Sequence, residues 1–187
     1  MYINKKRVSL PDTAGTYLAI ALIDLMEKKP LEEISITELT KKAGVSRMSY
    51  YRSFDSKQHI LEEYLQTIVR RFRMEGEKRG YLGKEHGYEQ LLYAFRFFRH
   101  HRRYALCLHN ANLSSILLDG LNKYMDQYML PPDADFAKRY KTYAYAGVLY
   151  NLYIQWLKGG MQESEEQMAE ITFRIMFPHS PLPNEKK

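Results

Sequence analysis

Apolar residues recur every three to four positions along most of this chain, which is the spacing that places side chains on one face of an α-helix. The first such segment predicts a helix over 11–29, which Pro30 ends because proline has no backbone N–H to donate. A longer segment predicts a helix that Ser56 caps and that continues to about residue 79.

The same spacing dominates the second half of the chain. A glycine-rich loop over 80–87 precedes a helix that begins at Tyr88. Residues 103–130 predict two helices that separate near 109–112, and 135–158 predict one long helix. A last helix begins at the capping box Ser164-x-x-Gln167. No segment favours a strand, so the chain is expected to be all-α with about nine helices.

Between the first and the long helix, residues 35–54 predict two short helices joined by a tight turn. Ser35 can accept from the backbone of the first short helix, and Glu38 is expected to reach back to Ser35. Gly44 stands where the chain needs a left-handed residue, and Ser46 can cap the second short helix. The pattern is that of a helix-turn-helix, although a hairpin of two helices in another kind of α protein has similar spacing.

The second short helix is rich in hydrogen-bonding and stacking groups. Such a helix can lie in the major groove of DNA and offer contacts to bases and phosphates. Its polar and aromatic side chains are Arg47, Ser49, Tyr50, Tyr51 and Arg52, and Ser46 precedes them.

At these residues the chain resembles the DNA-binding module of the TetR family of bacterial transcription regulators, over about residues 9–65. The resemblance lies in the joined pattern Ala43-Gly44-Val45-Ser46-Arg47-x-Ser49-x-Tyr51-x-x-Phe54-x-Ser56-Lys57. Met48 departs from it, because many members carry a small residue there, and Pro30 replaces a frequent glycine.

The resemblance implies phosphate contacts from Ser35, Thr37, Tyr51 and Lys57, and groove contacts from Arg47, Met48, Ser49 and Tyr50. For some of these residues a structural role is an open alternative: Ser35 can serve only as a cap, and packing is slightly favoured for Tyr50. With Ser46 and Arg52, the expected DNA-binding set is Ser35, Thr37, Ser46, Arg47, Met48, Ser49, Tyr50, Tyr51, Arg52 and Lys57.

The C-terminal half is similar to the DhaS-like branch of the same family, which includes activators of dihydroxyacetone-kinase operons. The similarity rests on Asn151-Leu152-x-x-x-Gln155-Trp156-Leu157-Lys158-x-Gly160-Met161. It implies a DNA-binding domain over 9–70, a regulatory and dimerisation domain over 71–178 and a flexible tail over 179–187. A homodimer is expected through the last two helices, with Ala144, Gly147 and Ile171 at the interface.

Charge and composition fit this interpretation without deciding it. The net charge is +6, and residues 1–110 hold 20 basic and 13 acidic side chains, whereas residues 111–187 hold 8 and 9. A basic N-terminal part suits contact with phosphates. The short basic arm Lys5-Lys6-Arg7 can reach DNA, but a solvated tail is favoured. The single cysteine, Cys107, fits a reducing cytoplasm, and no segment is apolar enough for a membrane span.

The C-terminal half is also rich in aromatic residues, which usually pack as core. The family resemblance implies that part of this core opens into an effector cavity, lined by Phe95, Phe98, Cys107, Tyr150 and Trp156.

The histidines lack metal-ligand spacing, and no catalytic motif occurs, so we expect no cofactor, no metal and no enzyme activity. The expected partners are an operator in double-stranded DNA, a second copy of the chain, and a small effector or a protein co-regulator. The alternatives are a ligand-binding helical protein, a small all-α enzyme using the aromatic core, and a non-specific nucleoid protein.

Overall fold

A computed structural model describes residues 13–82 and 87–182 and confirms the all-α fold. Over those ranges it contains nine α-helices and no strand. The helices are α1 (Ala14–Met26), α2 (Ile36–Ala43), α3 (Arg47–Ser53), α4 (Lys57–Lys78), α5 (Gly87–His100), α6 (Arg102–Asn110), α7 (Ser115–Tyr124), α8 (Phe136–Lys158) and α9 (Glu165–Met176). A 3₁₀ turn (Leu31–Glu33) precedes α2, and a π-helical segment (Met125–Met129) follows α7.

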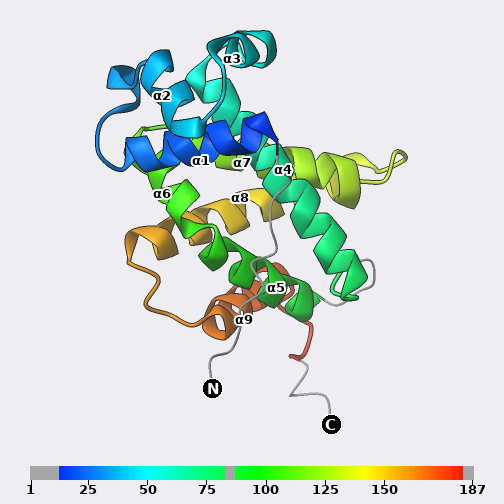
Figure 1. Cartoon of the computed structure of the whole chain (residues 1–187). Coiled ribbons are helices and arrows are strands. Elements are labelled where there is room, and N and C mark those ends of the chain that lie inside the picture. Colours follow the sequence, from blue (N-terminus) through cyan, green and yellow to red (C-terminus); the bar gives the residue numbers. More distant parts are fainter. Residues whose placement is uncertain (1–12, 83–86, 183–187) are drawn as a thin grey trace. The chain divides into compact units, whose positions relative to one another are not determined.

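The chain divides into two compact units (Figure 1). Unit 1 extends to Thr67 and unit 2 begins at Ile68, so the boundary lies inside α4. This position is three residues before the domain boundary that we expect from the sequence. The expected arm at Lys5-Lys6-Arg7 and most of the expected tail lie outside the described residues.

In unit 1, α1 packs against α2 and α2 packs against α3. The core contains Leu18, Leu22 and Leu39, which have no exposed surface. Burying one such leucine side chain stabilises the folded state by roughly 1.5–3 kcal/mol. Thr13 caps α1, which ends at Met26, three residues before the predicted end, because the chain turns before it reaches Pro30.

In unit 2, α5 packs along α9, and α8 packs against α7 and α9. The helix boundaries follow the prediction closely: α6 ends and α7 begins on either side of the expected break, and α8 matches within one residue. The second capping box is confirmed. The Ser164 hydroxyl accepts from the Gln167 amide (3.2 Å), and the Ser164 amide donates to the Gln167 side chain (2.8 Å).

A stack of three aromatic rings joins α4 to α5 within unit 2. Tyr93 lies between Phe72 (ring centroids 4.8 Å apart) and Tyr81 (5.1 Å). Its hydroxyl donates to the Phe72 carbonyl (3.1 Å), and burial raises the pKa of Tyr93 to about 12. Gly76 makes room for this stack, since a Cβ there would lie 2.5 Å from a Leu82 methyl carbon and 2.8 Å from the Tyr93 ring.

We therefore expect Gly76→Ala to destabilise unit 2 by about 1–3 kcal/mol through overpacking, despite the better helix propensity of alanine. Urea unfolding measures this loss. The matched control is the double variant Gly76→Ala/Leu82→Ala, whose loss should be smaller than the sum of the two single losses. Additive losses would contradict the overpacking argument.

Candidate nucleic-acid interface

The turn between α2 and α3 has the geometry that its sequence predicts. Gly44 is left-handed, with φ at 65°, and its amide donates to carbonyls at the end of α2. The Ser35 hydroxyl accepts from the Glu38 amide (3.1 Å), and the Ser46 hydroxyl accepts from the Ser49 amide (3.0 Å). These caps fix where both helices begin.

One part of the expected first capping box is wrong. The Glu38 carboxylate pairs with the Lys29 ammonium (2.5 Å) rather than reaching back to Ser35. An ion pair with a lysine near the end of α1 competes successfully with a hydrogen bond to an exposed backbone amide. Together with the pair between Lys42 and Asp24 (3.2 Å), it ties α2 to the end of α1.

The outer face of α3 presents both charged and apolar groups. Met48 is 77% exposed and Tyr51 is 56% exposed, and Arg47 and Arg52 are exposed beside them. The Arg47 guanidinium lies 6.0 Å from the centroid of the Tyr51 ring. Met48 and Tyr51 are each more than half exposed, so much of both side chains is available to a partner.

The inner face of α3 is packed. Tyr50 is only 3% exposed, and its ring lies against Tyr51 (5.2 Å) and Phe54 (6.3 Å). Burial, the largest cause, raises the pKa of Tyr50. Phe54 is also buried and contacts the His59 ring (5.6 Å) at the start of α4. Tyr50 therefore lies in the core of unit 1, where packing occupies its ring.

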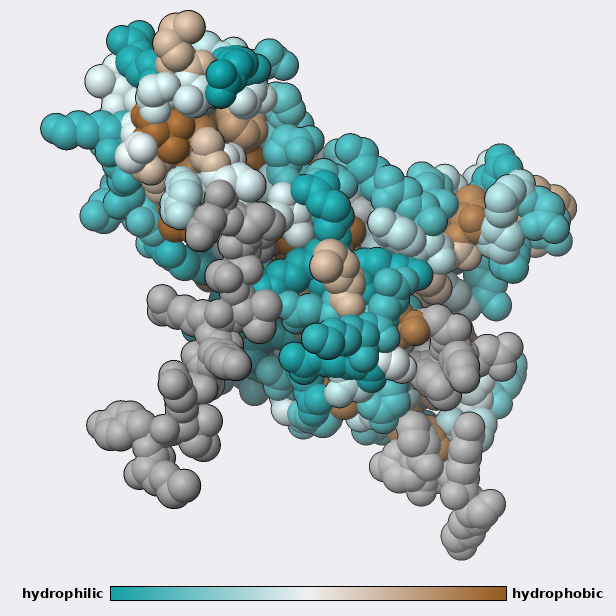
Figure 2. Space-filling view, turned by 45° about the vertical axis from the view of Figure 1, so that its right-hand side comes forward, coloured by the Kyte–Doolittle hydropathy of each residue, from teal (hydrophilic) through white to brown (hydrophobic). Residues whose placement is uncertain are grey.

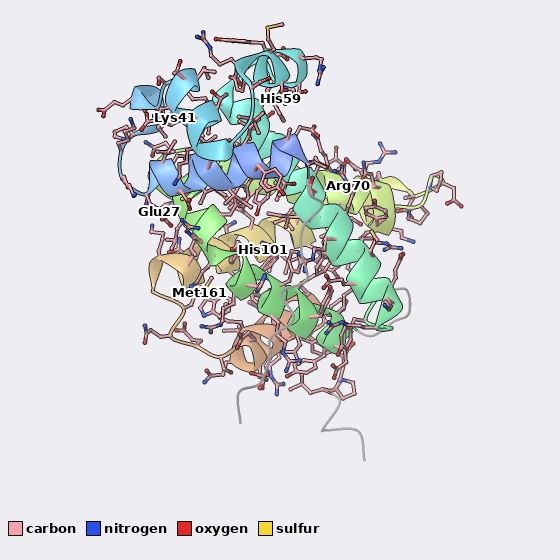
Figure 3. All side chains as sticks on the ribbon, in the orientation of Figure 1. Glu27, Lys41, His59, Arg70, His101 and Met161 are labelled. Carbon is pink, nitrogen blue, oxygen red and sulfur yellow. The ribbon has the colours of Figure 1, made fainter. Side chains whose placement is uncertain are left out.

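The remaining expected contact residues differ in how far their polar groups are engaged. Thr37 is exposed at the start of α2. Lys41, which is not one of the expected contact residues, is exposed on the same helix (Figure 3). The Ser46 and Ser49 hydroxyls lie 2.9 Å apart and hydrogen-bond to each other. The Lys57 ammonium donates to backbone carbonyls at 31–34. This last contact could not be predicted from residue spacing, because its partners are backbone atoms 23 or more residues away.

In unit 2, three of the five expected pocket residues, Phe95, Phe98 and Trp156, form a packed cluster with their neighbours between α5 and α8. Phe95 has no exposed surface, and its ring packs edge-on against Phe98 (5.7 Å) and Trp156 (5.6 Å). Tyr153 stacks on Phe98 (4.4 Å) and donates to its carbonyl (3.1 Å). The Trp156 indole N–H donates to the Glu163 carbonyl (3.2 Å). The polar groups of this cluster are thus satisfied within the protein.

Arg99 ties that cluster to the loop between α8 and α9. Its guanidinium lies 4.6 Å from the centroid of the Trp156 ring, and it donates to the carbonyls of Met161 (3.1 Å) and Glu163 (2.7 Å). Met161, in that loop (Figure 3), is buried despite a positive φ of 54°. Of the other expected pocket residues, Cys107 is buried on α6 and Tyr150 is half-buried on α8.

Sequence reasoning missed a second cluster, in which rings of α4, α5 and α7 pack together and one of the α5 rings contacts a histidine. Phe72 contacts Phe97 (5.0 Å) and Tyr124 (5.7 Å), and the His101 ring lies 4.4 Å from Phe97. Burial lowers the pKa of His101 to about 4, and the neighbouring His100 adds to the effect. The His101 Nε2 atom is buried and has no hydrogen-bond partner among the described residues (Figure 3). Helical spacing alone does not distinguish these rings from ordinary core.

The long helix α8 and the last helix α9 leave an apolar strip uncovered within unit 2. Ile171 and Ile175 are each 51% exposed on α9. On α8, Tyr140 is 70% exposed, Ala144 is exposed, and a Cβ at Gly147 would meet no atom within 4 Å. Hydrophilic residues cover much of the face seen in Figure 2, where hydrophobic ones form scattered groups.

Membrane-spanning helices and clusters of metal ligands are both absent from the described residues. No helix among them is both long and apolar enough to cross a bilayer. No three histidine, cysteine or acidic side chains of residues 13–82 and 87–182 lie close enough to share a metal ion.

Comparisons with known proteins agree with the fold and the helix-turn-helix. Residues 21–64 match the family model described as "Bacterial regulatory proteins, tetR family", and residues 85–178 match the one described as "Transcriptional regulator C-terminal region". The HTH-type transcriptional regulator EthR of Mycobacterium tuberculosis is 36% identical over 66 residues. That match covers 34% of this chain and 31% of EthR, so it spans about a third of either protein.

Solved structures share the fold over most of the chain. The dihydroxyacetone kinase operon activator DhaS aligns with a TM-score of 0.59 at 15% identity, covering 88% of this chain and 94% of DhaS. NalD, the secondary repressor of the MexAB-OprM multidrug efflux pump in Pseudomonas aeruginosa, aligns with a TM-score of 0.56 at 18% identity, covering 88% of this chain and 96% of NalD. With both family models matched and the helix-turn-helix in place, the chain belongs to the TetR family of bacterial regulatory proteins.

Proposed function

We propose that this protein is a transcription regulator that binds a short inverted repeat in DNA as a homodimer, in the bacterial cytoplasm. The observation that carries the proposal is the outer face of α3, where Arg47, Met48, Tyr51 and Arg52 are exposed on a helix that follows a helix-turn-helix turn. Members of this family regulate transcription and are in general not enzymes.

In this proposal α3 lies in the major groove. Arg47 can bind guanine edges or a phosphate, and the Ser49 hydroxyl can reach a base after exchanging its bond with Ser46. Met48, the most exposed side chain of the face, suits the methyl group of thymine. Tyr51, Thr37 and the start of α2 then meet phosphates, because helix N-termini favour anions.

The homodimer is supported by the strip on α8 and α9. Ile171 and Ile175 lie one turn apart on α9, and their half-exposed side chains gain by burial against a second copy. Ala144 and Gly147 have no large side chain on the face of α8, so that another helix can approach closely. In the proposed dimer, two copies of α3 bind major grooves about one DNA turn, roughly 34–36 Å, apart.

Regulation is proposed to act through unit 2, by a small effector or a protein co-regulator. Because α4 belongs to both units, a shift of its unit 2 portion can be passed to its first turn. The expected contact residues are Phe95, Phe98, Cys107, Tyr150 and Trp156. The unsatisfied Nε2 of His101 adds a polar group that an effector can use.

Selection of bound sequences from a random DNA pool tests the proposal. We expect an inverted repeat whose half-sites are one turn apart. Arg47→Ala and Ser49→Ala should each change the preferred bases and cost roughly 1–3 kcal/mol of discrimination per lost base contact.

The matched control is Arg139→Ala, which removes an exposed arginine from α8 in unit 2 and should leave the selected sequence unchanged. If the pool yields no repeat, and binding falls steeply with salt without any sequence preference, the protein is a non-specific DNA-binding protein instead.

A further inference from the structure

The side chain of Lys57, the first residue of α4, turns back to the 3₁₀ turn that precedes α2. Its Nζ donates to the carbonyl oxygens of Leu31, Ile34 (2.7 Å) and Glu32 (3.4 Å). A lysine ammonium has three N–H donors and no acceptor. Three carbonyl oxygens of the protein itself therefore occupy all the donors that Lys57 has.

Two of these carbonyls, those of Glu32 and Ile34, accept from no backbone amide among the described residues. The 3₁₀ turn has two backbone bonds of its own, from the Glu33 amide to the Pro30 carbonyl (3.1 Å) and from the Ile34 amide to the Leu31 carbonyl (3.3 Å). At the end of a short helical turn, carbonyls point away from the chain without an intrahelical partner. A cation placed among them forms charge-assisted bonds, which are stronger than neutral ones.

The turn that Lys57 holds leads directly into the proposed DNA interface. Ile34 is 2% exposed and fixes the turn in the core of unit 1, and the next residue is Ser35, the cap of α2. Thr37 follows in the first turn of α2 and is exposed. The position of the α2 N-terminus, where phosphates are favoured, thus depends on the contact from α4.

We infer that Lys57 is a positioning residue that sets the start of α2 for DNA, and that its ammonium does not neutralise a phosphate. The inference rests on the proposed DNA-binding function and gives Lys57 a different role within it. Since Lys57 lies on α4, the same contact carries a displacement of the first turn of α4 to the cap of α2.

The salt dependence of DNA affinity separates a positioning role from a phosphate contact. Each phosphate contact contributes about 0.9 to the slope of log affinity against log salt concentration. We expect Lys57→Met to lower affinity for the selected repeat by at least about tenfold, with the slope unchanged. The comparison variant is Arg52→Gln, which removes an exposed cation from α3 and should lower the slope. A slope that falls by about 0.9 per half-site in Lys57→Met, or an affinity that does not change, overturns the inference.

Hydrogen exchange in the DNA-free protein tests the contact by itself. In Lys57→Met the amides of Ile34 and Glu38 should exchange at least about tenfold faster, because the turn and the cap of α2 lose their support. The amide of Leu22, in the middle of α1, should keep its rate. Equal acceleration at all three amides means general destabilisation and contradicts a positioning role, and so does no acceleration at Ile34. This measurement needs no DNA, so it decides the role of the contact even if the proposed function fails.

Discussion

Replacing Ile171 by glutamate is expected to lower the affinity for a full operator by at least about a hundredfold while each protomer stays folded. The side chain is 51% exposed, so the charge meets solvent in a single protomer. In the proposed dimer it meets its own symmetry mate across an apolar face, where like charges without partners are costly. The dimer then separates. Each protomer binds its half-site alone, without the higher effective concentration that a linked second protomer has at the second half-site.

Light scattering at micromolar concentration measures the first step. The wild type should have twice the mass of the 22.2 kDa chain, and Ile171→Glu should have the mass of one chain. Gly147→Trp provides a second variant, because a Cβ at that position would meet no atom within 4 Å in the protomer. The large side chain is therefore expected to obstruct an approaching helix.

The matched control is Leu106→Glu, which places the same charge on an exposed apolar position of α6 in unit 2. It should leave both the mass and the operator affinity unchanged. A wild type that runs as a single chain at these concentrations would contradict the constitutive dimer, and the α8 and α9 strip would need another partner.

Local features of the fold could be predicted because their causes lie within a few residues of one another. Ser35, Gly44 and Ser46 act on amides three residues away or on their own backbone, so the helix-turn-helix follows from short spacings. The same reasoning gave both ends of α8 within one residue, because Asp135 caps its start and glycines follow its end.

Contacts between distant residues could not be predicted, because spacing carries no information about them. Glu38 suits a capping box, yet it pairs with Lys29 on a neighbouring segment. Lys57 suits a phosphate contact by analogy with the family, yet its ammonium lies among the carbonyls at 31–34. In both cases a charged side chain has several possible partners, and tertiary packing decides which of them is near.

Aromatic residues show the same limit in unit 2. Helical spacing places Phe95, Phe97 and Phe98 on α5, but it does not tell which faces α8 and which faces α4. In the structure Phe95 and Phe98 join Trp156 and Tyr153, whereas Phe97 joins Phe72 and His101. Two clusters therefore exist where the sequence suggested one core, and only the first contains residues expected to line a pocket.

Phe95→Ala is expected to destabilise unit 2 by about 3–5 kcal/mol, because the ring has no exposed surface and packs edge-on against two other rings. Urea unfolding measures the loss. The matched control is Phe136→Ala on α8, where the ring is 78% exposed and the loss should stay within about 0.5 kcal/mol.

The size of that loss separates a packed core from an effector pocket at this cluster. A ring that lines open space has fewer neighbours to lose, so a loss below about 1 kcal/mol would support a cavity beside Phe95. In that case an effector should alter the fluorescence of Trp156, the single tryptophan, which lies 5.6 Å from the Phe95 ring. It should also change operator affinity by the same factor by which DNA changes effector affinity.

A full loss of 3–5 kcal/mol, with Trp156 emission insensitive to every small molecule that alters transcription, would exclude an effector site at this cluster. The signal would then enter elsewhere in unit 2, at the cluster around His101 or from a protein co-regulator.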